Sequence, residues 1–169
     1  MYYTNTDVCN IAAKNDNLDL LRFAHDEGYG WNISTCVIAA ENGHLRCLQY
    51  LRENGCRWDE RVCIAAAYNG HLDVLRYLSS QDCLWTWETY AAAAYSGNLK
   101  CLQFMRNVDA DQIIWNECVC AAAAYGDQLS VLQYLHQAGC PWNSLSCQLA
   151  SQANSLDCLS YALSRGCSW

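Results

Sequence analysis

The residues of this chain with the largest number of possible chemical roles are its thirteen cysteines, because thiolates bind metal ions, form disulfides and act as nucleophiles. They follow a repeating pattern. When positions are counted from a recurrent tryptophan as zero, position 5 holds Cys9, Cys36, Cys63, Cys120 and Cys147. Position 16 holds Cys47, Cys101 and Cys158, position 25 holds Cys56, Cys83, Cys140 and Cys167, and Cys118 alone falls outside these positions.

The spacing of these cysteines favours buried, reduced thiols. Position 16 alternates Cys with Leu and Val, as small core residues do and metal ligands do not. Stacked helices lie about 8–10 Å apart, whereas a Zn–S bond is about 2.3 Å long and the Cα atoms of a disulfide lie within about 7 Å. The alternative is a metal or redox role for cysteines of neighbouring repeats, with Cys56 paired to Cys63 and Cys140 paired to Cys147.

No other residues form a catalytic pattern. His44 and His71 occupy position 13, where Asn or Ser stands in other repeats, so a capping role is favoured over a general base or a metal ligand. The sequence contains no G-x-S-x-G, H-E-x-x-H, C-x-x-C or glycine-rich phosphate loop. We therefore expect a protein without catalytic residues, metal site, cofactor or small-molecule substrate, which is not an enzyme.

The elements that position these residues are set by the repeat itself. One column of the repeat reads Thr4, Trp31, Trp58, Trp85, Trp115, Trp142 and Trp169, at intervals of 27 residues with a single interval of 30. A fixed period of this length is typical of a solenoid, in which each unit packs on its neighbours. The period predicts one repeat domain over residues 1–169, with repeats at 4–30, 31–57, 58–84, 85–114, 115–141 and 142–168.

Each repeat is predicted to form two short helices. Position 1 holds residues that cap helix N-termini, namely Asn5, Asn32, Asp59, Thr86, Asn116 and Asn143. Position 12 holds residues that tolerate positive φ and so end the first helix, namely Asp16, Gly43, Gly70, Gly97, Asp127 and Asn154. The second helix begins at the polar position 13, and its apolar positions 14, 16, 17, 19 and 20 are expected to supply most of the core. No segment alternates with period two, so the predicted fold is all-α.

One segment resembles a known family. The run from Cys36 to Cys56, CVIAAENGHLRCLQYLRENGC, is similar to the ankyrin repeat pattern T-P-L-H-x-A-A-x-x-G-H-x-x-V-V-x-x-L-L-x-x-G-A from the double alanine onward. The similarity recurs from Ala66, Ala93 and Ala123. Short repeats marked by Trp and Cys also resemble the ankyrin-like repeats that are abundant in giant DNA viruses and protists. The resemblance implies a helix-turn-helix solenoid that binds proteins on its concave face.

The sequence departs from the ankyrin pattern in two ways. The opening T-P-L-H is absent from every repeat, and the period is 27 residues where ankyrin repeats have about 33. The missing residues match the length of the β-hairpin finger that ankyrin proteins use for binding. We therefore expect little or no β-hairpin, and contacts made by fingers are not implied here.

Composition limits the possible partners. The 169 residues include 10 Lys and Arg against 17 Asp and Glu, for a formal charge of -7. This sign opposes nucleic-acid binding and favours a basic partner. No apolar run is long enough to span a bilayer, so no membrane contact is expected. Residues 1–10 show no secretory signal, so we expect an intracellular, cytoplasmic protein, in the host-cell cytoplasm if it is viral.

The binding surface is predicted from the positions that vary between repeats. Tyr68, Tyr95 and Tyr125 occupy position 10 of three successive repeats, with Ala91 and Ala121 as a shallow floor four residues earlier. Tyrosine is enriched in binding hot spots. The alternative is that these rings only pack between repeats.

Four more residues complete the candidate binding set, because they lie at the starts of the first helices: Glu60, Trp87, Glu88 and Glu117. The sequence thus predicts a non-catalytic scaffold for protein–protein interaction. The alternative function is a structural subunit of a larger assembly, such as a viral particle or a multiprotein complex.

Overall fold

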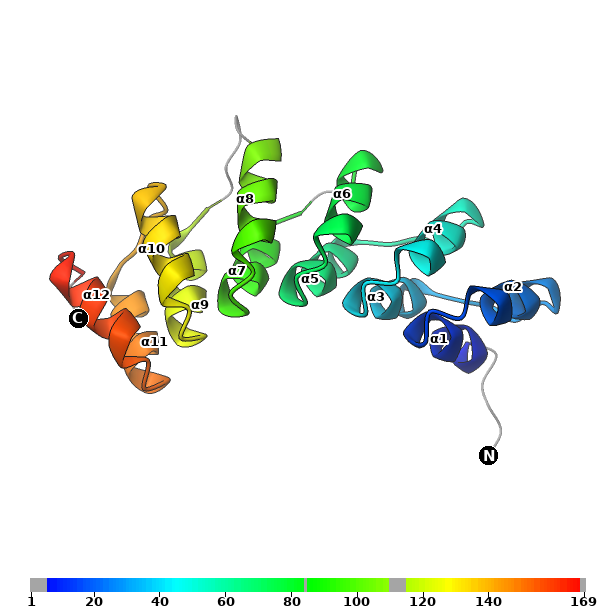
Figure 1. Ribbon diagram of the computed structural model, residues 1–169, viewed down its shortest axis with the longest axis horizontal. Coiled ribbons are helices and arrows are strands. Elements are labelled where there is room, and N and C mark those ends of the chain that lie inside the picture. Colours follow the sequence, from blue (N-terminus) through cyan, green and yellow to red (C-terminus); the bar gives the residue numbers. More distant parts are fainter. Residues whose placement is uncertain (1–5, 84, 110–114, 168–169) are drawn as a thin grey trace. The chain divides into compact units, whose positions relative to one another are not determined.

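A computed structural model describes residues 6–83, 85–109 and 115–167, and within them the chain forms twelve helices and no strand. The helices are α1 (Asp7–Lys14), α2 (Leu18–Asp26), α3 (Ile33–Glu41), α4 (Leu45–Glu53), α5 (Glu60–Tyr68), α6 (Leu72–Ser80), α7 (Trp87–Tyr95), α8 (Leu99–Val108), α9 (Glu117–Tyr125), α10 (Leu129–Gln137), α11 (Ser144–Gln152) and α12 (Leu156–Ser164). Each predicted repeat contributes one pair of helices (Figure 1). The predicted all-α class is confirmed.

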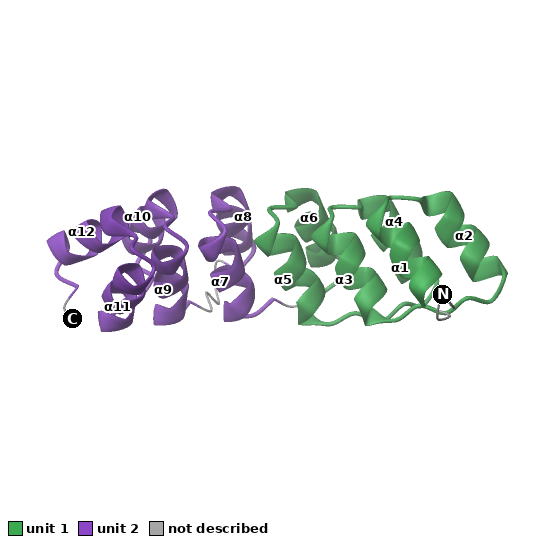
Figure 2. Cartoon of the chain, turned by 90° about the horizontal axis from the view of Figure 1, so that it is seen from below, with its two compact units in different colours: residues 1–84 green, residues 85–169 purple. Residues whose placement is uncertain are grey.

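The chain divides into two compact units, residues 1–84 and 85–169, with three helix pairs in each (Figure 2). In the first unit, α1, α3 and α5 pack in one layer and α2, α4 and α6 in the other. In the second unit, α7, α9 and α11 pack in one layer, and α10 packs on α12 in the other. We call the layer of odd-numbered helices in each unit its first-helix face. One repeat domain over residues 1–169 stays a prediction.

The helix starts follow the predicted caps. The side chains of Asn32, Asp59, Asn116 and Asn143 each accept a hydrogen bond from the backbone N–H two residues later. These bonds satisfy donors that a helix N-terminus leaves open. Asn5 lies outside the described residues, and Thr6 is the residue that precedes α1.

The turn inside each repeat also has the predicted conformation. All six residues at position 12 have positive φ, including Asp16 at 52°, Asp127 at 57° and Asn154 at 59°. The other three are glycines, and at Gly43 there is no room for a side chain. A Cβ atom added there would lie 2.5 Å from Nδ1 of His71 in the next repeat.

The core lies between the two layers. The alanines at position 8 are fully buried in all six repeats, namely Ala12, Ala39, Ala66, Ala93, Ala123 and Ala150. The prediction that position 14 contributes to the core is only half right, because its leucines are partly exposed and Leu156 is 64% exposed. Position 14 is the first residue of the second helix, so its side chain covers the edge of the core. The leucine three residues later, at position 17, is buried in five of the six repeats.

The histidines at position 13 do not cap the second helices with their side chains. The side chain of Asn17 caps α2, as predicted, but His44 and His71 make no such bond. Instead, Nδ1 of His44 lies 2.7 Å from the carbonyl oxygen of Ala13, and Nε2 of His71 lies 2.9 Å from that of Glu41. Both rings therefore reach back from the turn inside their own repeat to the first helix of the preceding repeat.

The tryptophans join neighbouring repeats. Each described tryptophan of the repeat column packs edge-on against the aromatic ring at position 19 of its own repeat, as Trp58 does on Tyr77 at 6.1 Å between centroids. Four of them also contact a side chain at position 21 of the preceding repeat. His25 lies 4.3 Å from Trp31 between centroids, and the guanidinium carbon of Arg52 lies 4.4 Å from the centroid of Trp58.

Candidate functional site

The helices of the first-helix face in the second unit start in register. Asn116 accepts a hydrogen bond of 3.0 Å from the backbone N–H of Cys118, and Asn143 accepts one of 2.9 Å from that of Leu145. Since α7, α9 and α11 each contain nine residues, position 10 is the last helical residue in all three. Equivalent side chains therefore stand next to one another across the layer.

Tyr95 and Tyr125 stack on this face. Their ring centroids are 6.0 Å apart with 29° between the planes, and the two residues are 38% and 43% exposed. Their closeness depends on Gly126, because a Cβ atom at that residue would lie 2.0 Å from the carbonyl oxygen of Tyr95. Backbone contact at the end of α7 thus holds the two rings side by side. The predicted adjacency is confirmed for this pair.

A shallow groove of about 440 Å³ runs beside the two rings across α7, α9 and α11. It is lined by Trp87, Ala91, Tyr95, Cys118, Ala121, Ala122, Tyr125, Leu145, Leu149 and Gln152, and we call it the tyrosine groove. The expected alanine floor is present. Apolar and aromatic atoms dominate the lining, as is usual for surfaces that bind ligands or proteins.

The charged residues of α7, α9 and α11 are all acidic. Glu88 and Glu117 lie exposed in the first turns of α7 and α9, and these three helices contain no other Asp or Glu and no Lys or Arg. The Glu88 carboxylate accepts a short hydrogen bond from the hydroxyl of Thr86. Both carboxylates also interact favourably with the positive ends of their helices. The tyrosine groove thus has carboxylates on the helices that form it and no cation.

The other two predicted site residues lie elsewhere, in the first unit. Tyr68 is 46% exposed and lines a pocket of about 320 Å³ with Glu41, Arg61 and Ile64 among its other walls. Glu60 lines a different pocket, which also contains Cys83. The structure therefore distributes the candidate set over three places, and only Trp87, Tyr95 and Tyr125 share one groove.

The sequence analysis did not assign five of the lining residues to the site, namely Cys118 and Ala122 of α9 and Leu145, Leu149 and Gln152 of α11. A signal for them exists. Positions 3, 7 and 10 follow the i, i+4, i+7 spacing of one helix face, and Leu145, Leu149 and Gln152 occupy these positions in the last repeat. At position 10 only the tyrosines were predicted to bind, and Gln152 of α11 and the residues at positions 3 and 7 of α9 and α11 were not assigned to the site.

The cysteines pair within a repeat. The Sγ atoms of Cys36 and Cys56 are 2.9 Å apart, and those of Cys63 and Cys83 are 3.0 Å apart. The alternative pairs across a repeat boundary, Cys56 with Cys63 and Cys140 with Cys147, are therefore wrong. Position 25 pairs instead with position 5 of its own repeat, because the chain after the second helix returns over the start of the first.

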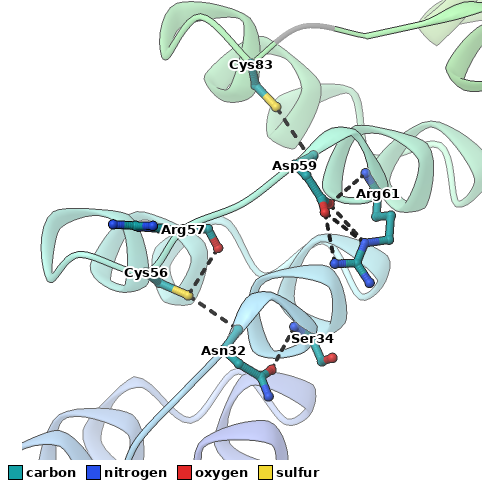
Figure 3. A network of polar contacts seen from close by, with 7 residues as sticks. All are labelled: Asn32, Ser34, Cys56, Arg57, Asp59, Arg61 and Cys83. Atoms are coloured by element: carbon teal, nitrogen blue, oxygen red, sulfur yellow. Dashed lines mark hydrogen bonds and ion pairs between the residues drawn. The ribbon is translucent and has the colours of Figure 1, made fainter.

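Hydrogen bonds show this return directly. The Cys56 thiol donates to the carbonyl oxygen of Asn32 at 3.4 Å, and the Cys83 thiol does so to that of Asp59 at 4.0 Å (Figure 3). In the fifth repeat, Cys140 donates to Asn116 at 3.6 Å. Position 25 thus joins the end of each of these repeats to its N-terminal cap.

The thiols are free and, apart from the half-buried Cys118, buried. Burial raises the pKa of Cys47 to about 12 and that of Cys158 to about 11, with nearby carboxylates adding to the effect. The paired thiols differ, because a hydrogen bond donated by Cys36 lowers the pKa of Cys56 while raising that of Cys36. The described residues contain no cluster of three or more His, Cys, Asp or Glu side chains that could hold a metal ion.

None of the helices that the structure describes has both the length and the apolar character needed to cross a bilayer.

Comparisons with known proteins agree with the helical repeats. A family model described as ankyrin repeats in three copies matches residues 9–85 and 37–114. The crystal structure of the human ASB11 ankyrin repeat domain superposes with a TM-score of 0.71 at 15% sequence identity, covering 95% of this chain and 84% of that one. At this identity the likeness concerns the fold alone. No curated protein matches the chain by sequence.

Proposed function

The chain belongs to the ankyrin repeat family, whose repeats mediate protein–protein interaction, and on this basis we propose that it is a non-catalytic scaffold that binds a partner protein through its tyrosine groove. The groove lies on the first-helix face, which the family resemblance implies is concave. The single observation that carries the proposal is the stacked pair Tyr95 and Tyr125 beside an apolar groove of about 440 Å³.

The stacked rings suit a binding role because they are held in place before a partner arrives. Tyr95 and Tyr125 are about two-fifths exposed, so much of each ring would be buried only in a complex. Rigid aromatic side chains lose little conformational entropy on binding, and they are enriched among the residues that dominate binding energy. Trp87 and Leu149 extend the same apolar surface on either side.

The charges favour a partner segment that is both apolar and basic. Apolar side chains of the partner would enter the groove, while Lys or Arg side chains would approach Glu88 and Glu117. Such rim charges mainly increase the association rate and select against acidic partners. Tyr68 and Glu60, on the other unit, are proposed as additional contacts for a longer partner.

Selection of peptides from a displayed library on the immobilised full chain tests this proposal. We expect enriched peptides that combine aliphatic or aromatic residues with Lys or Arg. Fluorescence anisotropy with one such labelled peptide then compares the wild type with Tyr125→Ala and Leu149→Asp. Each change is expected to weaken binding by about tenfold or more, which corresponds to about 1.4 kcal/mol.

Tyr29→Ala is the matched control, because Tyr29 has a similar exposure of 37% but lies in the first unit. The control is expected to bind the peptide as the wild type does. Circular dichroism confirms that each variant is folded. Equal affinity of folded Tyr125→Ala, Leu149→Asp and wild-type chains for every selected peptide would show that the groove is not the binding site.

A further inference from the structure

We propose that Cys63 and Cys83 form a modification site, a dithiol that hydrogen peroxide converts into a disulfide. The two residues belong to the third repeat, with Cys63 in α5 and Cys83 just after α6. This inference does not depend on the tyrosine groove, which lies in the other unit. It rests on the separation of the two sulfur atoms, on the access of solvent to one of them, and on the charges around the pair.

The geometry of the pair is close to that of a disulfide. The Sγ atoms are 3.0 Å apart, and a disulfide requires about 2.05 Å, so the sulfurs need to approach by about 1 Å. Cys63 is held in a helix and is fully buried, whereas Cys83 follows the turn at Asp82, which has a φ of 53°. The Cys83 end of the pair is therefore the one that can adjust.

Solvent reaches Cys83 through a pocket. Cys83 lines a cavity of about 320 Å³ together with Arg52, Trp58, Asp59 and Glu60. This volume is many times the roughly 30 Å³ that a water molecule occupies, so a molecule of the size of peroxide can enter. Cys83 is 9% exposed, against 2% for Cys56, the corresponding residue of the similarly spaced pair with Cys36. Access thus favours the pair in the third repeat.

The two thiols have different chemical roles. The hydrogen bond between the two thiols and the positive charge of Arg52 lower the pKa of Cys83, although burial and the carboxylates of Asp59 and Glu60 oppose them. The same hydrogen bond, followed by burial, raises the pKa of Cys63. Cys83 is also the more exposed of the two and lines the pocket, so it is the sulfur that ionises and attacks first, and Cys63 is the second thiol, which completes the bond.

The charges around the pocket favour a small neutral oxidant. The carboxylates of Asp59, Glu60 and Asp82 line the pocket with Arg52, and Arg52 is the only cation among the residues that line it. Asp59 is itself paired with Arg61, at 2.9 Å between Nη2 and Oδ2 (Figure 3). The acidic rim disfavours large anionic oxidants such as glutathione disulfide, whereas uncharged hydrogen peroxide is not repelled.

The reaction balances with peroxide as the two-electron oxidant. The Cys83 thiolate attacks one peroxide oxygen, the O–O bond breaks, and the departing hydroxide takes a proton to become water. Cys83 is then a sulfenic acid. The Cys63 sulfur attacks the Cys83 sulfur, the S–O bond breaks, and the leaving hydroxide combines with the Cys63 proton as a second water. Two thiols and one peroxide thus give one disulfide and two waters.

Peptide mapping of the full chain tests the proposal. The protein, carrying Cys118→Ser to remove the half-buried thiol, is freed of reductant, exposed to hydrogen peroxide for increasing times, blocked with N-ethylmaleimide, digested and analysed by mass spectrometry. We expect the cross-linked peptide of Cys63 and Cys83 to appear several-fold faster than the linkage of Cys36 to Cys56 or the loss of the buried Cys101 thiol. Dithiothreitol should reverse it, and the oxidised protein should have a higher melting temperature because the disulfide closes a loop within one repeat.

Two variants separate the roles of the sulfurs. Cys63→Ala should leave a Cys83 sulfenic acid that dimedone traps, whereas Cys83→Ala should leave Cys63 as a thiol. Arg52→Gln should slow the oxidation several-fold. The chain that carries only Cys118→Ser has no substitution at the paired cysteines, so its time course tests the proposal even where the other variants do not fold. If the Cys63–Cys83 bond formed no faster than the Cys101 thiol is lost, the proposal would be overturned.

Discussion

Tyr90 donates a hydrogen bond of 2.6 Å to Asp109, and this pair links position 5 of the fourth repeat to the end of its second helix, where two cysteines make the corresponding link in the third and fifth. Tyr90 is fully buried, and the indole N–H of Trp85 donates to the same carboxylate oxygen. A charged hydrogen-bond network thus replaces thiols at one repeat of the array. It connects the end of that repeat to its first helix, as position 25 does elsewhere.

Replacing Tyr90 by Phe should lower the free energy of unfolding by about 1–3 kcal/mol, because the Asp109 carboxylate loses one of its two donors in a largely buried site. Urea denaturation followed by circular dichroism measures the change. Tyr125→Phe is the control, since its ring is 43% exposed, and it should change stability by less than about 0.5 kcal/mol. Equal effects of the two variants would contradict the structural role of the Tyr90 hydroxyl.

Gly43→Ala should destabilise the first unit by more than about 1 kcal/mol, because the residue has a φ of 73° and the new methyl group would meet the ring of His71 at 2.5 Å. Gly30→Ala is the matched control, since its Cβ would meet nothing within 4 Å and its φ is not positive. Thermal unfolding compares the two. In a His71→Ala background the penalty of Gly43→Ala should shrink to that of the backbone alone; an unchanged penalty would rule out the predicted clash.

Stability should fall at alkaline pH through the buried thiols. The pKa of Cys47 is about 12 in the folded chain and about 8.5 when unfolded, so above pH 8.5 the unfolded state binds fewer protons than the native state. The stabilising contribution is complete below about pH 8.5 and is lost as the pH rises towards 12, with a slope of at most about 1.4 kcal/mol per pH unit.

Cys47→Val isolates this contribution, because Val occupies the same position in two other repeats and does not titrate. Urea midpoints measured in a phosphine reductant at several pH values above 8 should fall less steeply for the variant than for the wild type. Parallel pH profiles would show that Cys47 does not keep its proton in the folded chain.

Binding through the tyrosine groove should depend on salt and on the two carboxylates beside it. Changing Glu88 and Glu117 to Gln together should slow association with a basic peptide several-fold and leave dissociation nearly unchanged. Raising NaCl from about 0.05 to about 0.3 M should weaken wild-type binding more than variant binding, because exposed charges are screened over about 10 Å at 0.1 M. Stopped-flow fluorescence measures both rates; identical salt dependence would remove the electrostatic part of the proposal.

Much of the fold could be predicted because the same pattern of residues occurs in six repeats. The stop at position 12 is correct even at Asp16 and Asn154, where no glycine is present, since their side chains tolerate left-handed backbone. The cysteine partners could not be derived in the same way. The spacing predicts where Cys56 stands within its repeat. Its contact with Cys36 depends on the path of the chain after the second helix, which the spacing does not predict.

The candidate site was predicted in part for a related reason. Position 10 varies between repeats and holds Tyr in three of them, so Tyr95 and Tyr125 could be recognised as candidates. Leu149 lies on the same face, but it resembles any apolar residue of a helix, and its exposure to the groove depends on the small alanines of α9 beside it. His44 is a similar case, because its partner is a backbone carbonyl 31 residues away.

The contacts of Trp31 and Trp58 with their preceding repeats make the joints of the first unit interchangeable. His25 packs on Trp31, and Arg52 occupies the same position against Trp58. If residues 31–57 were excised, Trp58 would meet His25, a partner that already accepts an indole. Loss or duplication of a gene segment encoding 27 residues would therefore shorten or lengthen this stack without exposing a mismatched junction.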